Sequence, residues 1–524
     1  MSMTLPERLD AKLFSDLLAR IALRPDAASP ETAPLIAPFT GEKIIDVPTC
    51  ALADVTHAAE EAHLAQKAWR ALPAKRRAKL FLRFHDLVLD RQETLLDLIQ
   101  LETGKARRHA FEEVLDTAIC SRYYAHAAPR MLASESRQGA FPVLTKASVL
   151  HPPLGLVGFI TPWNYPLSLA ITDAIPALIA GNAVLLKPDQ QTPLTALFAA
   201  RLLDEAGLPP GLFQVLTGPG RTLGEPILDR VDAISFTGST ATGRIIARQA
   251  GERLIGASLE LGGKNAMLVC EDADLDRAVR AAIVGAFTNS GQLCISIERL
   301  FVHRALADAF IERFVNQVRA LRIDAGFGDE ADMGSLVNAA QLAKVERHVR
   351  DALAKGAQAL AGGRARPDLG PYFYEPTVLD GVTDAMEIFS EETFGPVVSL
   401  YRFDSEAEAV ERANASAYGL NASVWTRDTK RGFELARRIE AGTVNVNEPY
   451  AAAWASVDAP MGGFKTSGLG RRHGREGLLK YTQAQTVAVQ RFMPVSQTPG
   501  GDGAAYRKRM TDAVRALRRL PGVD

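Results

Sequence analysis

The chain has 524 residues, a formal net charge of −1 and a hydrophobic content of 47%. This composition is typical of a soluble globular protein, and the near-neutral charge argues against a general attraction to nucleic acid or to an anionic membrane. A chain of this length exceeds one compact core, so two or three domains are expected.

Targeting and metal-binding signals are missing from the sequence. No apolar run reaches the roughly 18 residues of a membrane span, so no integral membrane segment is expected. The start, MSMTLPERLDAKLF, does not have the pattern of a signal peptide. The four cysteines lack the C-x-x-C spacing of a metal site, and we predict a cytoplasmic protein with free thiols and no metal.

The first half of the chain changes from helical patterns to strand-helix alternation. Residues 1 to about 30 predict a helix and a turn, and residues 51–115 contain long amphipathic helical patterns. TPLTALFAARLLDEAG predicts a helix that ends at Gly207. Buried strands are predicted at 154–160, 182–187, 211–216 and 231–238. This alternation indicates a parallel sheet covered by helices, which binds ligands beyond the carboxyl ends of its strands.

A second α/β stretch follows at about 263–455, and it contains a conspicuous cysteine. DADLDRAVRAAIVGAF has an Asp start signal and an apolar helical stripe that ends at Phe287. Gly291 marks a turn, so Cys294 is expected just beyond a buried helix. A cysteine there is either a small buried apolar residue or a nucleophile, and this position favours a nucleophile.

The last elements are expected to lie outside the two α/β units. Residues 140–153 alternate like a projecting two-stranded arm, and 481–490 predict a late strand; we interpret both as oligomer contacts. Residues 491–524 contain a Gly/Pro break and a basic amphipathic helix. The apolar face of that helix is formed by Met510, Val514, Leu517 and Leu520. Docking on the protein's own surface is the favoured interpretation, with an anionic membrane as the alternative.

Six motifs in order resemble the aldehyde dehydrogenase superfamily over about residues 40–490. They are TPWNYPL (161–167), FTGSTATG (236–243), LELGGKN (259–265), GQLC (291–294), EETFGPV (391–397) and PMGGFKTSGLGR near the C-terminus. The resemblance implies an α/β fold with two doubly wound parallel-sheet domains and a small β oligomerisation arm. We expect a cofactor-binding domain at 1–139 and 154–262, a catalytic domain at 263–457, the arm at 140–153 and 478–492, and the basic extension at 493–524.

The resemblance implies a covalent mechanism. Cys294 would attack the aldehyde carbon, a hydride would leave for the nicotinamide, and water would hydrolyse the resulting thioester to a carboxylic acid. Asn164 would form the oxyanion hole with the backbone N–H of Cys294. Glu260 would activate the water, the alternative being an ion pair with Lys264. The remaining cysteines are expected to be ordinary buried residues; they are Cys50, Cys120 and Cys270.

The cofactor-binding residues are also implied by the resemblance, because the chain has no G-x-G-x-x-G fingerprint. Gly238 and Ser239 would hold the pyrophosphate beside a helix N-terminus. The nicotinamide half would be lined by Trp163, Asn164, Leu261, Glu392 and Phe394.

The segment KPDQQTP chooses between the two nicotinamide cofactors. Lys187 and the following Pro188 and Asp189 would lie at the adenosine ribose. Gln190 stands where NAD-preferring members usually carry Glu, which removes the repulsion of a 2′-phosphate. We therefore predict NADP as cofactor, with NAD possible.

The sequence contains signals for two different classes of aldehyde substrate. GQLCISIERL and GRRHGREGLLKYT resemble bacterial succinate-semialdehyde dehydrogenases, but Thr288 and the Thr172–Asp173 pair stand where those enzymes hold the substrate carboxylate with arginines. Only Ser456 matches, and nothing in the sequence places the side chain of Arg299, the one candidate replacement. Tyr450 and Trp454 favour an apolar or aromatic aldehyde, so both substrate classes stay open.

Other classes of function also remain open at this point. Cys294 and an oxyanion hole would serve a cysteine esterase or acyltransferase without cofactor, and the chain could be a structural relative without activity. The expected partners are a small-molecule aldehyde and further copies of the chain, as a homodimer or homotetramer.

Overall fold

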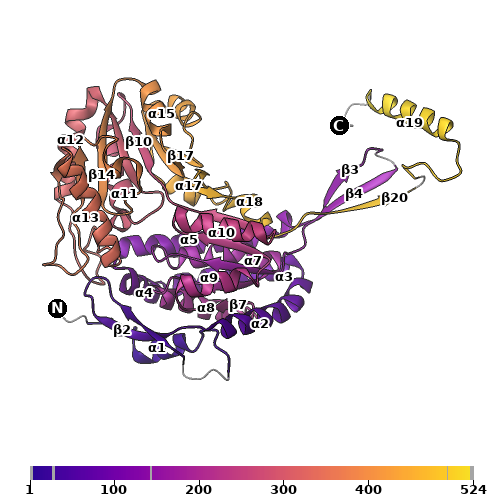
Figure 1. Ribbon diagram of the computed structural model, residues 1–524, viewed down its shortest axis with the longest axis horizontal. Coiled ribbons are helices and arrows are strands. Elements are labelled where there is room, and N and C mark those ends of the chain that lie inside the picture. The colour runs from indigo at the N-terminus through magenta and orange to yellow at the C-terminus, as the bar shows by residue number, and fades with distance from the viewer. Residues whose placement is uncertain (1–3, 26–29, 142–143, 492–493, 520–524) are drawn as a thin grey trace.

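The computed structural model describes residues 4–25, 30–141, 144–491 and 494–519. Figure 1 shows two α/β lobes and a thin β arm that projects away from them. The predicted α/β class, with two mostly parallel sheets and a small arm, is confirmed. In the described ranges, no helix combines the length and the apolar character needed to cross a membrane.

The first lobe is built on a six-stranded sheet in the order β19-β9-β8-β5-β6-β7. Its strands are β5 (Leu156–Ile160), β6 (Ala183–Lys187), β7 (Phe213–Val215), β8 (Ala233–Thr237), β9 (Gly256–Glu260) and β19 (Gly468–Leu469). All neighbours pair in parallel except β19, which is antiparallel to β9. Every residue of β5 and β6 is buried, as is usual in a parallel sheet covered on both faces. The four strands predicted for this region are confirmed.

Helices cover this sheet, and a small two-stranded sheet lies between α1 and α2 in the chain. The helices are α1 (Ala11–Leu18), α2 (Leu52–Ala71), α3 (Ala74–Asp90), α4 (Gln92–Thr103), α5 (Arg107–Met131), α6 (Ser168–Ile171), α7 (Ala174–Ala180), α8 (Pro193–Ala206), α9 (Gly220–Leu228) and α10 (Thr240–Glu252). The small sheet pairs β1 (Thr32–Ile36) with β2 (Lys43–Pro48). The predicted stop of α8 at Gly207 is confirmed by its left-handed φ of 102°. The N-terminal helix α1 is shorter than predicted.

The second lobe contains a seven-stranded sheet in the order β12-β13-β14-β11-β10-β16-β17. Its strands are β10 (Asn265–Val269), β11 (Ile297–His303), β12 (Gln358–Ala361), β13 (Thr377–Asp380), β14 (Val397–Phe403), β16 (Asn421–Trp425) and β17 (Thr443–Val446). Only the edge pair β12–β13 is antiparallel. The helices are α11 (Leu275–Phe287), α12 (Arg304–Arg319), α13 (Ala339–Ala354), α14 (Glu387–Ser390), α15 (Glu406–Asn414), α16 (Thr429–Ala436) and α17 (Ala451–Ala455). A short pair, β15 (Tyr418–Gly419) and β18 (Phe464–Lys465), completes it. The later helix α18 (Gly474–Leu479) packs against α5 and α7 of the first lobe.

The arm has three strands, and they are β3 (Glu135–Gln138), β4 (Thr145–Leu150) and β20 (Gln485–Gln490). The late strand β20 pairs antiparallel with β4 of the same chain, and β3 lies before residue 140, where the sequence placed the start of the arm. The tail helix α19 (Gly503–Leu517) has no buried residue and lies beyond the arm in Figure 1. The expected docking of this helix on its own chain is therefore not seen; Leu520 lies outside the described residues.

The two sheets meet at a short linker. Strand β9 ends at Glu260 and β10 begins at Asn265, so residues 261–264 carry the chain from one lobe to the other. In a parallel sheet the carboxyl ends of the strands share one edge, and here β5, β6, β8 and β9 all end at the edge where the chain crosses. This crossing is the place where the fold brings polar side chains of both lobes together.

Candidate active site

Cys294 lies immediately after a strained turn that follows α11. The side chain of Asp274 caps α11 by accepting from the backbone N–H of Arg277, as the sequence predicted. Asn289 and Ser290 of the following short helix (η1, Thr288–Gly291) have left-handed φ values of 51° and 56°. Buried non-glycine residues in this conformation persist only where the surroundings enforce it. Cys294 is partly exposed, while the other three cysteines are buried as expected.

A buried network of amides holds Asn164 beside Cys294. The Nδ2 of Asn164 donates to the carbonyl of Gln292 at 3.0 Å, and Asn289 Nδ2 donates to the carbonyl of Asn164 at 3.0 Å. Lys105 Nζ also donates to that carbonyl, at 2.6 Å, and is paired with Glu113 at 2.7 Å; both charged side chains are fully buried. An amide has two N–H groups, so the second N–H of Asn164 is available to an oxygen bound at Cys294.

The surroundings of Cys294 favour the neutral thiol. Burial, and then the carboxyl groups of Glu260 and Glu392, raise the pKa of Cys294 to about 12, with Arg472 acting in the opposite direction. At neutral pH the thiol therefore needs a proton acceptor before it can attack an electrophile.

Glu260 lines the same cavity as Cys294 and is a candidate for that acceptor. It is buried at the end of β9, and its Oε1 has no hydrogen-bond partner among the described residues. Burial raises the pKa of Glu260 to about 7, with Arg472 and Lys480 opposing the shift. The alternative ion pair with Lys264 is wrong, because Lys264 Nζ lies 2.5 Å from Glu298 Oε2.

One side of Cys294 opens into a cavity of about 690 Å³ between the lobes. Its lining includes all seven residues predicted for the pyrophosphate and nicotinamide regions, which are Trp163, Asn164, Gly238, Ser239, Leu261, Glu392 and Phe394, together with Glu260. The rings of Trp163 and Phe394 meet edge to face at 5.6 Å. Glu392 accepts from the N–H of Gly263 at 2.8 Å, and burial raises its pKa to about 7.

Gly238 and Ser239, which are predicted to hold the pyrophosphate, line the cavity at the start of α10, and that role stays a prediction. Ser239 caps α10 by accepting from the N–H of Thr242 at 3.3 Å. The N–H of Gly238 already donates to the carbonyl of Glu260 at 3.1 Å. The N–H groups at the start of α10 point out of the helix, where they would be available to a bound anion.

The segment after β6 lies outside this cavity lining. Lys187 is buried, its Nζ donates to the carbonyl of Pro188 at 2.7 Å, and burial lowers its pKa. Asp189 accepts from the N–H of Gln191 at 2.9 Å, whereas Gln190 is exposed. Since β6 is next to β5 in the sheet, this segment suits the adenosine end of an extended dinucleotide whose other end reaches Cys294.

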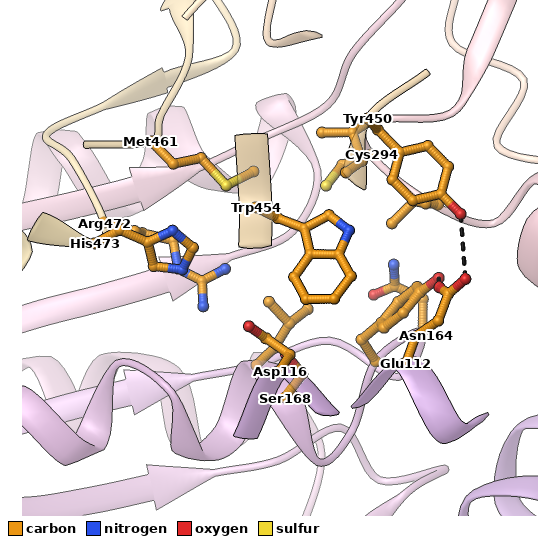
Figure 2. Close-up of a pocket in the computed structure, with 14 residues that line it drawn as sticks. Glu112, Asp116, Asn164, Ser168, Cys294, Tyr450, Trp454, Met461, Arg472 and His473 are labelled. Carbon is orange, nitrogen blue, oxygen red and sulfur yellow. Dashed lines mark hydrogen bonds between the residues drawn. The ribbon is translucent and has the colours of Figure 1, made fainter. Parts of the chain in front are cut away.

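The other side of Cys294 opens into a second cavity of about 580 Å³, shown in Figure 2. Its lining contains the predicted Tyr450 and Trp454, together with Glu112, Asp116, Asn164, Tyr165, Ser168, Leu169, Leu293, Cys294, Ile295, Met461, Arg472 and His473. Tyr450 Oη donates to Glu112 at 3.3 Å and lies 3.0 Å from Thr288 Oγ1. Cys294 and Asn164 belong to both cavities, so two ligands can meet at the sulfur.

Two residues considered for substrate binding lie elsewhere. Ser456 is exposed and donates to the carbonyl of Ala452 at 2.6 Å, and the cavity lining does not include it. Arg299 is buried against backbone and donates to the carbonyls of Lys264, Arg412 and Ala413. Neither residue reaches the cavity at Cys294 in this structure.

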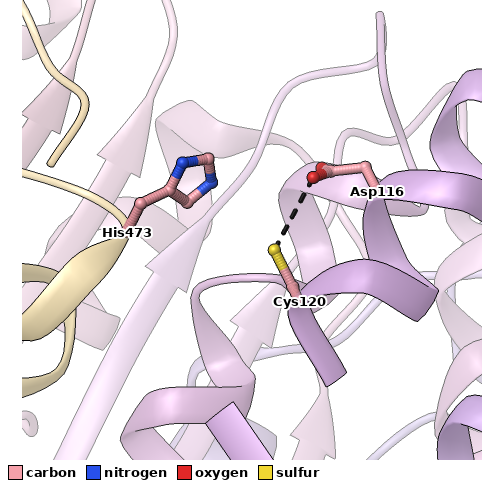
Figure 3. A group of neighbouring side chains, drawn as sticks. All are labelled: Asp116, Cys120 and His473. Atoms are coloured by element: carbon pink, nitrogen blue, oxygen red, sulfur yellow. Dashed lines mark hydrogen bonds between the residues drawn. The ribbon is translucent and has the colours of Figure 1, made fainter. Parts of the chain in front are cut away.

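Sequence reasoning missed four charged or titratable residues of this cavity, namely Glu112, Asp116, Arg472 and His473. Glu112 and Asp116 share one face of α5 at the i, i+4 spacing, which was a usable signal. Arg472 and His473 come from a loop far along the chain, and only the tertiary structure joins them to α5. Asp116 and His473 of the lining lie close to Cys120, as Figure 3 shows.

Comparison with known proteins supports this site. Residues 25–487 match the model of the aldehyde dehydrogenase family. The chain is 50% identical, over 97% of its length and 98% of the relative, to a Mycolicibacterium smegmatis protein with the provisional name succinate-semialdehyde dehydrogenase (NADP+). A succinate-semialdehyde dehydrogenase from Burkholderia pseudomallei is similar in structure, with a TM-score of 0.84 and 36% identity over 90% of this chain and 96% of that one.

A further solved structure is PnpE in complex with nicotinamide adenine dinucleotide, with a TM-score of 0.84 and 36% identity over 88% of this chain and 94% of that one. With Cys294 and Asn164 in the lining of both cavities, Glu260 in the lining of one, and these matches over most of its length, the chain belongs to the aldehyde dehydrogenase family.

Proposed function

We propose that this chain oxidises succinate semialdehyde to succinate with NADP, and that it also accepts NAD. The observation that carries the proposal is the position of Cys294 and Asn164 in the lining of both cavities. The provisional name of the M. smegmatis relative and the name of the B. pseudomallei structure support the substrate. The rest of the chemistry follows from the residues present.

The first half-reaction forms a bond between sulfur and carbon. As Cys294 Sγ attacks the aldehyde carbon, its proton passes to Glu260, whose pKa of about 7 suits a proton acceptor at neutral pH. The carbonyl oxygen becomes negative and takes hydrogen bonds from Asn164 Nδ2 and the backbone N–H of Cys294. The chemistry that a nicotinamide cofactor supplies when bound in the 690 Å³ cavity is acceptance of a hydride from that carbon.

The second half-reaction releases the acid. The carbon is then held as a thioester on Cys294, and the proton that Glu260 took from the thiol leaves to solvent. The Glu260 carboxylate can then remove a proton from a water molecule that attacks the thioester carbon. The carbon–sulfur bond breaks, the carboxylic acid leaves, and the sulfur regains its proton. Because Glu260 Oε1 has no partner among the described residues, it is free to accept these protons.

The preference for NADP rests on Gln190. This side chain is exposed and neutral next to the buried cation of Lys187, so it presents no negative charge to a 2′-phosphate. The substitution Gln190→Glu should raise KM for NADP about tenfold and leave KM for NAD within about twofold. Gln138→Glu on the exposed strand β3 makes the same chemical change far from the site and should alter neither value.

The proposed substrate is tested with a panel of aldehydes. Succinate semialdehyde, butanal and benzaldehyde are each assayed with NADP and with NAD by the absorbance of the reduced cofactor. We expect kcat/KM for succinate semialdehyde with NADP to exceed the other values by about tenfold or more. A higher kcat/KM for butanal or benzaldehyde would favour the aromatic lining formed by Tyr450 and Trp454. Ester hydrolysis without any cofactor reduction would instead indicate a cysteine esterase.

Two properties of the whole protein belong to the same proposal. We infer that the arm makes contacts between subunits, because all six residues of β20 are exposed in the single chain. We also place the enzyme in the cytoplasm, in keeping with its four free cysteines.

A further inference from the structure

Arg472, which lies just outside the six family motifs, is part of the wall of the cavity shown in Figure 2. Arg472 and His473 form one part of the lining, and Figure 2 shows them on the opposite side of the Trp454 ring from Cys294 and Tyr450. Arg472 lies between β19 and α18 and is held in place by paired backbone hydrogen bonds with Met461, of 2.6 and 2.8 Å. The guanidinium is thus carried by a fixed segment of backbone.

The guanidinium of Arg472 has unused hydrogen-bonding capacity. Its Nη2 donates to Thr172 Oγ1 at 2.6 Å, and its Nε lies 3.1 Å from Asp173 Oδ2 without a hydrogen bond. In the described part of the chain no group accepts from Nη1. A buried arginine normally uses its donors fully, so these donors are suited to a ligand.

The carboxyl groups of the cavity, in contrast, already have donors. Glu112 accepts from the hydroxyls of Tyr165 and Tyr450, each at 3.3 Å. Asp116 accepts from Ser168 Oγ and from the thiol of Cys120. The polar groups that remain available in the lining are therefore donors, which suits an anionic ligand better than a cationic one.

His473 supplies a second independent observation. It is buried and lines the cavity, and its Nδ1 has no partner among the described residues. Its backbone has φ 61° and ψ 172°, a combination that is nearly restricted to glycine. Strain of this kind in a cavity wall is a feature of ligand-binding sites.

The charged groups around Arg472 are compatible with the binding of one more anion. Two cations, Arg472 and Lys480, share the carboxylate of Asp173, at 3.1 and 3.5 Å. Glu260 also lies near both cations, and burial raises its pKa to about 7. Burial raises the pKa of Asp116, which weakens its repulsion of an incoming anion. Cys120, Asp116 and His473 lie close enough to suggest a metal site, but burial and Asp116 raise the pKa of Cys120 well above its ordinary value, so this cluster holds a neutral thiol.

We propose that Arg472, assisted by His473, binds the distal carboxylate of the aldehyde substrate and sets the preference for a semialdehyde acid. This inference rests on the proposed function. In this proposal Arg472 takes the place of the arginines that are missing at Thr288 and at the Thr172–Asp173 pair. Thr172 and Asp173 orient Arg472 and do not bind the substrate themselves.

The test compares three aldehydes of similar size: succinate semialdehyde, butanal and 4-aminobutanal. In Arg472→Gln we expect kcat/KM for succinate semialdehyde to fall about 100-fold, while that for butanal changes less than about fivefold. The efficiency with 4-aminobutanal should rise relative to butanal. The Ki of succinate as an inhibitor should increase in parallel, which reports on carboxylate binding without turnover.

Controls separate a local effect from a folding defect. Arg471→Gln removes the neighbouring arginine, which does not line the cavity, and should leave all three substrates within about twofold. If Arg472→Gln does not fold, Arg472→Lys and the double variant Asp173→Asn/Arg472→Gln avoid an unpaired buried carboxylate, and the double variant should show the same selective loss.

Each outcome has a separate meaning. Equal losses with succinate semialdehyde and butanal, or an unchanged Ki for succinate, would overturn the role of Arg472 while the wild-type preference stands. A wild-type enzyme that prefers butanal or 4-aminobutanal would overturn the proposed substrate itself.

Discussion

At the scale of single residues, the proposed reaction depends on two groups, one that must lose a proton and one that must accept it. Cys294 must lose a proton in order to attack, and Glu260 must be able to accept one near pH 7. Burial raises the pKa of both groups, to about 12 and about 7, and each negative carboxylate nearby stabilises the thiol further. Proton transfer from Cys294 to Glu260 is therefore expected to occur only as the sulfur forms its bond to the aldehyde carbon.

This coupling predicts a pH dependence. The active form of Glu260 is the carboxylate, and its pKa is raised from the ordinary 4.5 to about 7, so the form that activates water is lost as pH falls through 7. We expect the rate of thioester hydrolysis to rise about tenfold from pH 6 to pH 8 and then to level off. Rapid-quench measurement of hydrolysis across this range tests it.

Two comparisons assign that pH dependence to Glu260. Glu391→Gln alters an exposed carboxyl group that does not line the cavity at Cys294 and should keep the wild-type profile. A wild-type rate that is flat from pH 6 to pH 8 would contradict a Glu260 base whose pKa is raised to about 7.

At the scale of elements, the position of Cys294 is set by α11 and the turn that follows it. The sequence predicted α11 well, because a capping aspartate and an apolar stripe are local signals. It also marked Gly291 as a turn. It could not predict the left-handed Asn289 and Ser290, since their conformation is enforced by contacts with distant residues such as His109 and Gly334.

Gly291→Ala tests whether this turn positions the nucleophile. The φ of Gly291 is 70°, and an added Cβ would overlap the carbonyl of Gly395, so the turn must shift. Left-handed strain alone costs about 1–3 kcal/mol. We expect a Tm lower by several degrees and a kcat/KM at least about tenfold lower, from thermal unfolding and steady-state kinetics.

Gly251→Ala is the matched control. Gly251 lies in the last turn of α10, and its added Cβ would meet nothing within 4 Å, so Tm should stay the same or rise slightly. A Gly291→Ala enzyme with wild-type Tm and kcat/KM would show that the turn tolerates a side chain and does not position Cys294.

At the scale of the whole molecule, the two lobes could be predicted and the arm only in part. Alternating strands and helices are visible as apolar runs, and these predicted the first sheet in detail. Strand β3 has the polar sequence ESRQ, which carries no strand pattern, and it forms because β4 offers it a hydrogen-bonding edge. Arg472 could not be predicted for the same reason, since its contacts with Thr172 and Asp173 arise only from the tertiary fold.

The exposed arm predicts that the chain is an oligomer. Val487 and Val489 of β20 are 42% and 52% exposed, and exposed apolar residues on an edge strand are suited to subunit contact. The double substitution Val487→Lys/Val489→Lys should shift the protein to smaller species in light scattering coupled to size-exclusion chromatography. Deletion of 494–524 tests separately whether the basic helix α19 contributes.

The oligomer size of the double-lysine variant is compared with that of the wild-type protein. A monomeric wild type would contradict the proposal for the arm directly. An oligomer of unchanged size in the double-lysine variant would place the subunit contacts on another surface, whereas a smaller species with normal cofactor binding would support the arm.

The central claim is that Cys294 carries the substrate as a thioester, and that Glu260 activates the water molecule that hydrolyses it. Its most direct test is mass spectrometry of acid-quenched Glu260→Gln enzyme after incubation with succinate semialdehyde and NADP. Because glutamine cannot accept the thiol proton, that proton must pass to solvent, and we predict a burst of about one reduced cofactor per subunit that forms more slowly than in the wild type. The variant should then carry a succinyl group on the peptide that contains Cys294. A burst without any adduct on that peptide, or an adduct on Cys50, Cys120 or Cys270 instead, would contradict it.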